Sequence, residues 1–341
     1  FAGPAHRLFI KIEQLDRSTI DGVIGGFFDE GSAQPVLESD VPTVDISTET
    51  RTSPFPRVGH DNHAIGRMGG EYLLERGFVN FAFIQWRTSC TSTDRFAGFR
   101  EALEEAGRTC HTITGQDYKQ ELIRETLGDW LAGLPKPVAI MTANDHLGTH
   151  AIGIAHELRL RVPDDVAVLS SENDPWPTTL STPPMSSVQP DDRQVGFRAA
   201  QTLDQLMAGQ TPPAQQLIAP IGVVKRPSTD IVLVDDSMIG KALAFIEQHC
   251  AEPITVEDVA EAVQTSRRTL ENRMKGAIGQ TPKTAIDRAR VDLAKKKLIT
   301  TEAPMDQIAY GCGYDRADRF FVVFKRITGM TPGQYRHQRG R

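Results

Sequence analysis

The sequence predicts an α/β domain over residues 1–232, followed by an all-α domain over residues 233–341. In the first part, short apolar runs alternate with helical patterns, which is typical of βαβ units wound on both faces of a mostly parallel sheet. After Val232 the strand patterns stop, and only helical patterns follow. A chain of 341 residues is also longer than one ordinary domain, so at least two domains are expected.

The candidate strands of the first part are short and almost continuously apolar, as expected for strands that are covered on both faces. They cover Asp21–Phe28, Thr43–Ser47, Asn80–Gln85, Val138–Thr142 and Asp165–Ser170. Helical patterns lie between these strands, and the first two patterns stop at Gly77 and Gly107, as helices often do. The helices are expected over Asn62–Arg76, Arg95–Ala106, Asp145–Leu158 and Asp192–Met207.

The all-α part contains six helical patterns in a row. They cover Ser237–His249, Val256–Ala262, Ser266–Gly276, Pro282–Leu298, Met305–Tyr310 and Arg316–Ile327. The balance of charge also changes here. Residues from Leu233 onward include 18 basic and 14 acidic side chains, whereas the preceding part has 20 basic and 30 acidic ones. This asymmetry suggests that the two parts have different partners.

Composition argues against two further classes of protein. The sequence has no stretch of about 18 consecutive apolar residues, so no membrane span is expected. The cysteines are scattered without a C-x-x-C motif, which argues against a disulfide scaffold or a zinc site. They are Cys90, Cys110, Cys250 and Cys312. We therefore expect a protein of the reducing cytoplasm.

A helix-turn-helix design occurs twice in the all-α part, over residues 255–275 and 304–326. In each copy, a short helix with a Val-Ala or Ile-Ala pair precedes a tight turn and a second helix. The second helix carries apolar residues four positions apart, which pack inward and leave the other face free. These residues are Leu270 and Met274 in the first copy, and Phe320 and Phe324 in the second. Such a second helix, with arginines on its free face, is suited to reading the major groove of DNA.

We expect three residues of each second helix to read base edges. They are Arg268, Glu271 and Asn272 in the first copy, and Ala317, Asp318 and Arg319 in the second. The DNA phosphates are expected to meet Arg267, Arg273, Lys275, Arg316, Lys325 and Arg326. The alternative is that these side chains form only a solvated helix face, but two copies in matching register argue against it.

Specific motifs extend through the whole last third of the chain. They are Ser-Arg-Arg-Thr-Leu (266–270), Gly-Gln-Thr-Pro (279–282), Lys-Lys-Lys-Leu (295–298), Ile-Ala (308–309), Cys-Gly-Tyr (312–314), Phe-Lys-Arg (324–326) and Gly-Met-Thr-Pro-Gly-Gln-Tyr-Arg (329–336). With these motifs, residues 233–341 resemble the AraC-type DNA-binding domain. In that family two helix-turn-helix units are joined by a long helix, here about Pro282–Leu298, and each unit enters its own major groove.

The α/β part carries a second set of motifs. They are Val-Gly-His-Asp-Asn (58–62), Asp-Arg-Phe-Ala-Gly-Phe (94–99), Ala-Asn-Asp (143–145), Val-Pro-Asp-Asp-Val-Ala-Val (162–168), Glu-Asn-Asp (172–174) and Arg-Pro-Ser-Thr (226–229). In order and spacing they resemble the sensor of LacI/GalR-type repressors. That resemblance implies a two-lobed, periplasmic-binding-protein-like fold, which is Rossmann-like. A sensor of this type followed by an AraC-type domain is the arrangement of xylose operon regulators, and this resemblance covers nearly the whole chain.

The resemblance implies a sugar site. Sugar hydroxyls both donate and accept hydrogen bonds, so their site needs carboxylates, amides and a guanidinium. Arg95, Asn144 and Glu172 match positions that contact sugar in the LacI-type family. We expect Arg95 at one end of the sugar, and Glu172 and Asn144 at the opposite end. The other candidate ligand residues are Asp61, Trp86, Asp145 and Asn173.

Structural roles are open alternatives for several of these residues. Asp61, Asp145 and Asn173 could equally cap helices, and Trp86 could equally pack in the core. One departure from the resembled family concerns the first βα unit of the sensor. It should precede Asp21, but only about twenty residues, including Leu8–Ile12, lie there. We therefore expect that unit to be incomplete.

Other motifs do not predict catalysis or a cofactor. His146 and His150 are four residues apart and could share a helical face, as two metal ligands would. Neither this pair nor the pair of His60 and His63 has a carboxylate partner motif, so no metal site is expected. Gly25-Gly26 lacks the spacing of a dinucleotide-binding loop, and the sequence has no P-loop, G-x-S-x-G or H-E-x-x-H motif. We expect no cofactor and no enzymatic activity.

The sequence thus predicts a transcription regulator that binds double-stranded DNA and is switched by a monosaccharide, with D-xylose or another pentose as the expected effector. The resemblance implies a homodimer that recruits RNA polymerase and activates genes for sugar use. Two alternatives stay open: a DNA-binding regulator whose α/β module only dimerises, and an enzyme that processes sugars.

Overall fold

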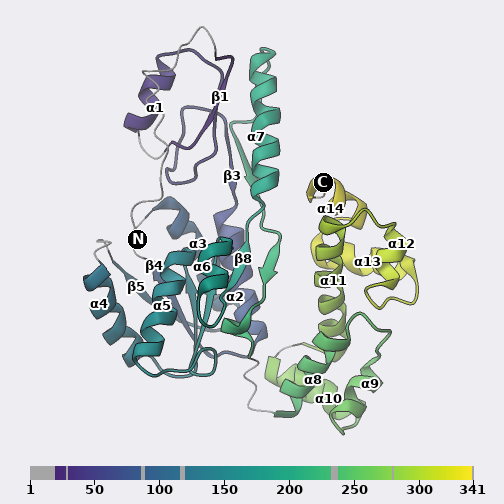
Figure 1. Ribbon diagram of the computed structural model, residues 1–341. Coiled ribbons are helices and arrows are strands. Elements are labelled where there is room, and N and C mark those ends of the chain that lie inside the picture. Colours follow the sequence, from purple (N-terminus) through teal and green to yellow (C-terminus); the bar gives the residue numbers. More distant parts are fainter. Residues whose placement is uncertain are drawn as a thin grey trace.

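The computed structural model describes residues 20–27, 30–85, 89–115, 120–231, 237–278 and 280–339. It contains an α/β part with two sheets and a separate group of helices near the carboxyl end (Figure 1). The predicted fold class is confirmed. The predicted domain boundary at residues 232 and 233 falls outside the described residues and stays a prediction, as does the incomplete unit around Leu8–Ile12.

The smaller sheet forms one lobe of the α/β part. Its four strands follow the order β1-β2-β3-β9, and all neighbours are parallel. They cover Val23–Gly25 (β1), Thr43–Asp45 (β2), Arg57–His60 (β3) and Gln215–Ile218 (β9). This lobe also holds α1 (Glu30–Leu37) and α7 (Asp192–Met207), and α7 packs its buried Val195 and Ala199 against β2 and β3.

The larger sheet has the order β10-β8-β7-β6-β4-β5. Among its described strands the β10–β8 pair is antiparallel and the other pairs are parallel. Its strands are β4 (Asn80–Gln85), β5 (Cys110–Thr114), β6 (Val138–Thr142), β7 (Val166–Ser170), β8 (Ser186–Gln189) and β10 (Gly222–Val224). Every residue of β6 and β7 is buried, as their continuous apolar sequences predict.

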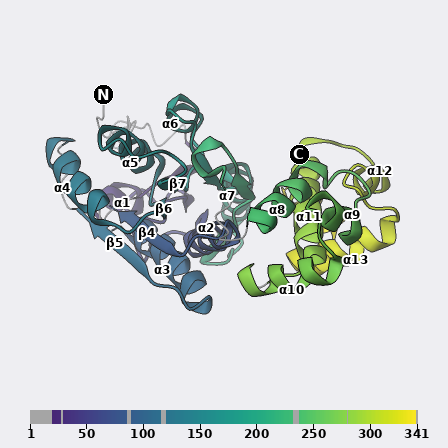
Figure 2. The same cartoon turned by 90° about the horizontal axis from the view of Figure 1, so that it is seen from below.

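Helices cover both faces of this larger sheet. Seen from below, α5 lies on one side of β4, β6 and β7, while α2 and α3 lie on the other (Figure 2). The helices are α2 (Asn62–Glu75), α3 (Cys90–Glu105), α4 (Gln120–Gly133), α5 (Asp145–Glu157) and α6 (Pro175–Leu180). The main core lies between them and the sheet, and its largest buried side chains include Phe78, Phe81, Phe83 and Phe99.

The described residues of the carboxyl-terminal part form seven helices. They are α8 (Ser237–His249), α9 (Val256–Ala262), α10 (Arg267–Ile278), α11 (Pro282–Thr300), α12 (Met305–Tyr310), α13 (Ala317–Thr328) and α14 (Pro332–Arg339). In Figure 1, α8, α9 and α10 lie at one end of α11, and α12, α13 and α14 lie at the other. Each end has its own apolar core. Ile286 of α11 belongs to the first core, and Val291 and Leu298 belong to the second.

The two parts touch along the end of α2. Arg288 of α11 forms an ion pair with Glu75, and Glu247 of α8 pairs with Arg76 (3.6 Å) and Lys225 (2.8 Å). A cavity of about 300 Å³ lies between these elements. In the described part of the chain, no helix combines the length and apolar character needed to cross a membrane.

Candidate ligand and DNA-binding sites

Arg95 on α3 is the centre of the candidate ligand site, and its guanidinium is only 4% exposed. Its Nε donates to Asn62 Oδ1 (3.0 Å), and its Nη1 donates to the Ala143 carbonyl (2.5 Å) and Ser171 Oγ (3.2 Å). A buried charge needs such partners to offset its lost hydration. Ala143 follows β6 and Ser171 follows β7, so Arg95 lies at the carboxyl edge of the larger sheet, where ligands bind in open α/β folds.

Glu172 lies directly beside Arg95, with Oε1 3.3 Å from Nη1, and its side chain is 41% exposed. The expectation that these two residues bind opposite ends of a sugar stays a prediction, and in the structure the two side chains form an ion pair. The strand order explains the pair. Because β6 lies between β4 and β7 in the sheet, the residues that follow these strands meet at the same edge. Together the two side chains form a paired guanidinium and carboxylate with part of the carboxylate open to solvent.

Close packing of α2 against α3 brings Asn62 to Arg95. A Cβ atom on Gly66 would lie 1.8 Å from the Arg95 carbonyl oxygen, and one on Gly98 would lie 2.0 Å from the His63 carbonyl oxygen. Any larger residue at either glycine would push the helices apart. Asn62 also donates from Nδ2 to Thr48 Oγ1 (2.8 Å), which follows β2 in the smaller lobe. Asn62 therefore links Arg95 to the other lobe.

The smaller lobe contributes a second carboxylate, Asp192, at the start of α7. Its Oδ1 lies 2.9 Å from His60 Nε2 at the end of β3, and the side chain is 76% exposed. The His60 side chain, at this distance, lowers the pKa of Asp192, and the charge of Arg95 acts in the same direction. The sequence reasoning missed Asp192 and Asn62. Their positions in the sequence could have indicated them, because each lies shortly after the end of a strand. Asn62 follows Asp61 after β3, and Asp192 follows Asp191 after β8.

Asp145 supports the loop that carries Glu172. It is 1% exposed, and its oxygens accept hydrogen bonds from Ser187 Oγ (3.1 Å), the Glu172 amide (3.3 Å), the Asp174 amide (2.6 Å) and Ser170 Oγ. Its carboxylate is thus engaged with protein donors. The ligand contact expected for Asp145 remains a prediction, and the structure gives it a positioning role behind Glu172.

Helix caps account for two other candidates. Asp61 caps α2, and Asn144 caps α5, each by accepting from a backbone N–H in the first turn (2.9 Å). The capping alternative is therefore confirmed for Asp61, whereas at α5 the cap is Asn144 rather than Asp145. Asn173 caps no helix. It has a positive φ of 54° and accepts from Arg226 Nη2 (2.8 Å). Trp86 lies outside the described residues.

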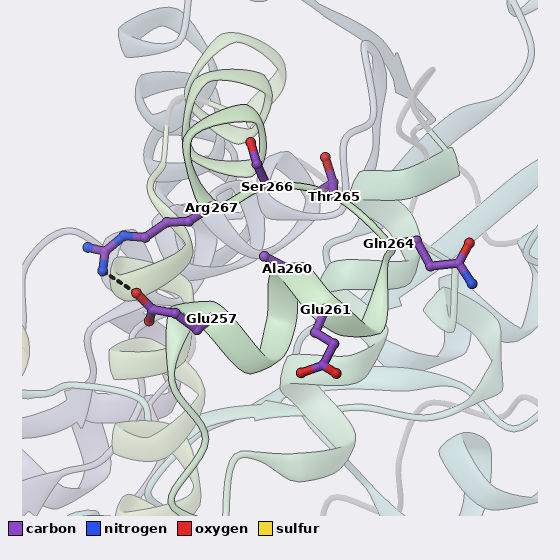
Figure 3. Close-up of a pocket in the computed structure, with 7 residues that line it drawn as sticks. All are labelled: Glu257, Ala260, Glu261, Gln264, Thr265, Ser266 and Arg267. Atoms are coloured by element: carbon purple, nitrogen blue, oxygen red, sulfur yellow. Dashed lines mark hydrogen bonds and ion pairs between the residues drawn. The ribbon is translucent and has the colours of Figure 1, made fainter.

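Helices α9 and α10, with the turn between them, form the first helix-turn-helix unit (Figure 3). It borders a pocket of about 660 Å³ that is lined by Glu257, Ala260, Glu261, Gln264, Thr265, Ser266 and Arg267. Arg267 pairs with Glu257 (2.5 Å) and Glu271 (2.8 Å). Arg268, Asn272, Arg273 and Lys275 are exposed on the same helix.

The second unit consists of α12, its turn and α13. Arg316 pairs with Asp318 (2.7 Å), and Arg319 lies 4.0 Å from Asp315. Arg326 instead bonds the buried Asp287 of α11 (2.8 Å), so it fastens α13 to the long helix. Lys325 is exposed, and Ala317 is half-buried. Across the described ranges, no three His, Cys, Asp or Glu side chains gather closely enough to hold a metal ion.

Comparisons with known proteins decide the family. The periplasmic binding protein-like domain family matches residues 71–229, and the helix-turn-helix domain family matches residues 259–338. The xylose operon regulatory protein of Escherichia coli (strain K12) is 30% identical over 337 residues, which are 96% of this chain and 86% of that protein. The chain belongs to the xylose operon regulatory protein family.

Further members and neighbours agree with this assignment. The xylose operon regulatory protein of Haemophilus influenzae is 28% identical, with 95% of this chain and 87% of that protein covered. A solved structure described as a xylose-binding transcription activator superposes with a TM-score of 0.56 at 29% identity. It covers 94% of this chain and 87% of the other. This member of the xylose operon regulatory protein family joins a periplasmic-binding-like domain to a helix-turn-helix domain.

Proposed function

We propose that this chain is a transcription regulator whose sensor binds a monosaccharide, D-xylose being the first candidate, and whose helical domain binds double-stranded operator DNA. The single observation that carries this proposal is the match to xylose operon regulatory proteins across both domains. The site geometry supports it from an independent direction, because Arg95 and Glu172 lie together at the carboxyl edge of the sheet.

The chemistry of the site suits a neutral polyol. Arg95, Glu172 and Asp192 supply both donors and acceptors, and the carboxylates are partly open to solvent. Thermal unfolding of the full chain with D-xylose, and with L-arabinose and D-glucose as competing candidates, tests this part. A hundredfold excess over Kd should stabilise the sensor by about 2.7 kcal/mol. A regulator whose α/β module only dimerises would show no shift with any sugar, and an enzyme would turn the sugar over.

We expect Arg268→Ala to weaken binding of the protein's own operator by about 1–3 kcal/mol and to relax the preference at one base pair. The reason is that Arg268 is exposed near the start of α10, where a planar guanidinium can bond a guanine with two hydrogen bonds. Fluorescence anisotropy with the operator and single-base variants measures this. If the substitution weakens all duplexes equally, Arg268 contacts only phosphate. Lys283→Ala, on α11, is the control for loss of one positive charge.

Helix α2 is our proposed route between the two sites. It begins at Asn62 beside Arg95 and ends at Glu75, which pairs with Arg288 of the helical part. A rearrangement of the lobes around a ligand would therefore reach α11 directly through one rigid element. These contacts of α2 add a connection to the covalent one through the chain.

The remaining expectations are carried forward as proposals. We propose a homodimer that activates transcription by recruiting RNA polymerase, in the cytoplasm where its DNA target lies. The solved neighbour described as a transcription activator supports activation over repression. Reporter expression with and without D-xylose, in strains with and without this regulator, decides between the two. Loss of an activator abolishes the rise in expression with sugar, whereas loss of a repressor leaves expression high without sugar.

A further inference from the structure

The outward face of α13 carries an apolar side chain that no described residue covers. Val322 is 69% exposed, while its neighbours Phe320, Val323 and Phe324 are buried in the second core of the helical part. It lies three and four positions after Arg319 and Asp318, so the three side chains share one face of the helix. An isolated exposed valine would need no explanation elsewhere, but this one lies on the face proposed to read DNA.

The internal repeat of the helical part shows which residue of the first unit corresponds to Val322. Leu270 and Met274 occupy the buried positions of α10 that Phe320 and Phe324 occupy in α13. In this register Val322 corresponds to Asn272, which is exposed on α10 and is expected to read a base edge. The same position of the two reading helices therefore presents an amide in one unit and a branched hydrocarbon in the other.

The chemistry of the major groove narrows what a valine can read there. Its side chain has no hydrogen-bonding atom, and the apolar group that a base pair presents in that groove is the C5-methyl of thymine. The flanking Arg316, Arg319 and Lys325 are exposed and complement the charge of the DNA backbone. We propose that Val322 determines specificity in the second unit by contacting a thymine methyl. This inference rests on the proposed DNA-binding function.

The test uses the full chain and a DNA duplex that this protein selects by binding from a library of random sequences. In that duplex each dT is replaced in turn by dU, which removes only the methyl group. With the unchanged protein, we expect one dT position in the second half-site to lose about four- to tenfold in affinity, as for one apolar contact. Val322→Ala should lose about the same factor on the original duplex and should bind the dU duplex no more weakly than the dT duplex.

Controls separate contact from structure. Val79→Ala makes the same change at an exposed valine of the sensor and should leave DNA affinity unchanged. Thermal unfolding of Val322→Ala should match the unchanged protein because the side chain is exposed. Equal loss on dT and dU duplexes, or no loss on either, overturns the thymine contact while DNA binding itself stands. Failure to enrich any duplex removes the proposed function, and this inference falls with it.

Discussion

Phe320→Ala is expected to destabilise the second helix-turn-helix unit by about 3–5 kcal/mol, the usual cost of removing a fully buried phenylalanine. Phe320 is 0% exposed, and its ring lies 5.4 Å from Tyr314 and 5.5 Å from Phe324 between ring centroids. The cavity left by the ring would lie where α12, α13 and α11 meet, because all three contribute to the same core. The reading face of α13 would lose its fixed orientation, and specific DNA affinity should fall with it.

The tryptophans allow this effect to be localised. All three, at positions 86, 130 and 176, precede the helical part. Tryptophan fluorescence in a denaturant titration should therefore report the sensor and stay nearly unchanged, whereas the circular dichroism transition of the helical part should shift. Phe197→Ala, at a side chain that is 62% exposed on α7, is the matched control and should cost no more than about 0.5 kcal/mol. A Phe320→Ala protein with unshifted helical unfolding would contradict the packing described for this core.

The second large effect is expected for Arg95→Ala, which should abolish the stabilisation by sugar and leave basal DNA affinity nearly intact. The substitution removes the donors bonded to Asn62, Ala143 and Ser171, and it leaves Glu172 without its partner. Unpaired buried acceptors cost about 1–3 kcal/mol each, so the sensor itself should also become less stable. Isothermal titration calorimetry with D-xylose gives the loss of affinity, and thermal unfolding gives the loss of stability.

Two variants keep this test interpretable. Arg100→Ala removes an arginine of the same helix whose side chain is 55% exposed, and it should leave sugar affinity unchanged. Arg95→Lys retains the charge but not the planar fork, so we expect partial stability with weakened sugar binding. Sugar binding of full strength by Arg95→Ala would remove Arg95 from the site.

The strands that could be predicted from sequence are those with a run of apolar side chains. The bounds of β4 and β6 are as expected, because each contains a buried apolar run, at residues 81–84 and 138–141. The sequence reasoning missed β3 and β8, whose buried residues include Arg57, Ser186 and Ser187. Arg57 is buried because Asp45, twelve residues away, accepts from its guanidinium (2.8 and 3.0 Å). Such partners are set by the tertiary fold, so the local pattern could not reveal these strands.

The candidate sites show the same division. The family resemblance grouped Arg95, Asn144 and Glu172 into one expected sugar site, and the helices α8, α9 and α12 have the predicted bounds. The pairing of Glu172 with Arg95 depends on which strands are neighbours, which the sequence did not reveal. The exposure of Val322 could not be predicted either. In the sequence it lies between the buried Phe320 and Phe324, and only the placement of α13 in its domain shows that its side chain faces outward.

The most direct test of a sugar-switched regulator is the affinity for D-xylose measured by titration with and without operator DNA. A ligand shifts an equilibrium only when it binds one state more tightly, and linkage requires operator DNA to change sugar affinity by the same factor that sugar changes DNA affinity. The structure offers α2 as the connection, from Asn62 at the ligand site to the ion pair of Glu75 with Arg288. We predict that operator DNA raises the affinity for D-xylose by about 5- to 150-fold, the usual range of such coupling. Identical affinities with and without DNA would contradict the account, even if both sites bind their ligands.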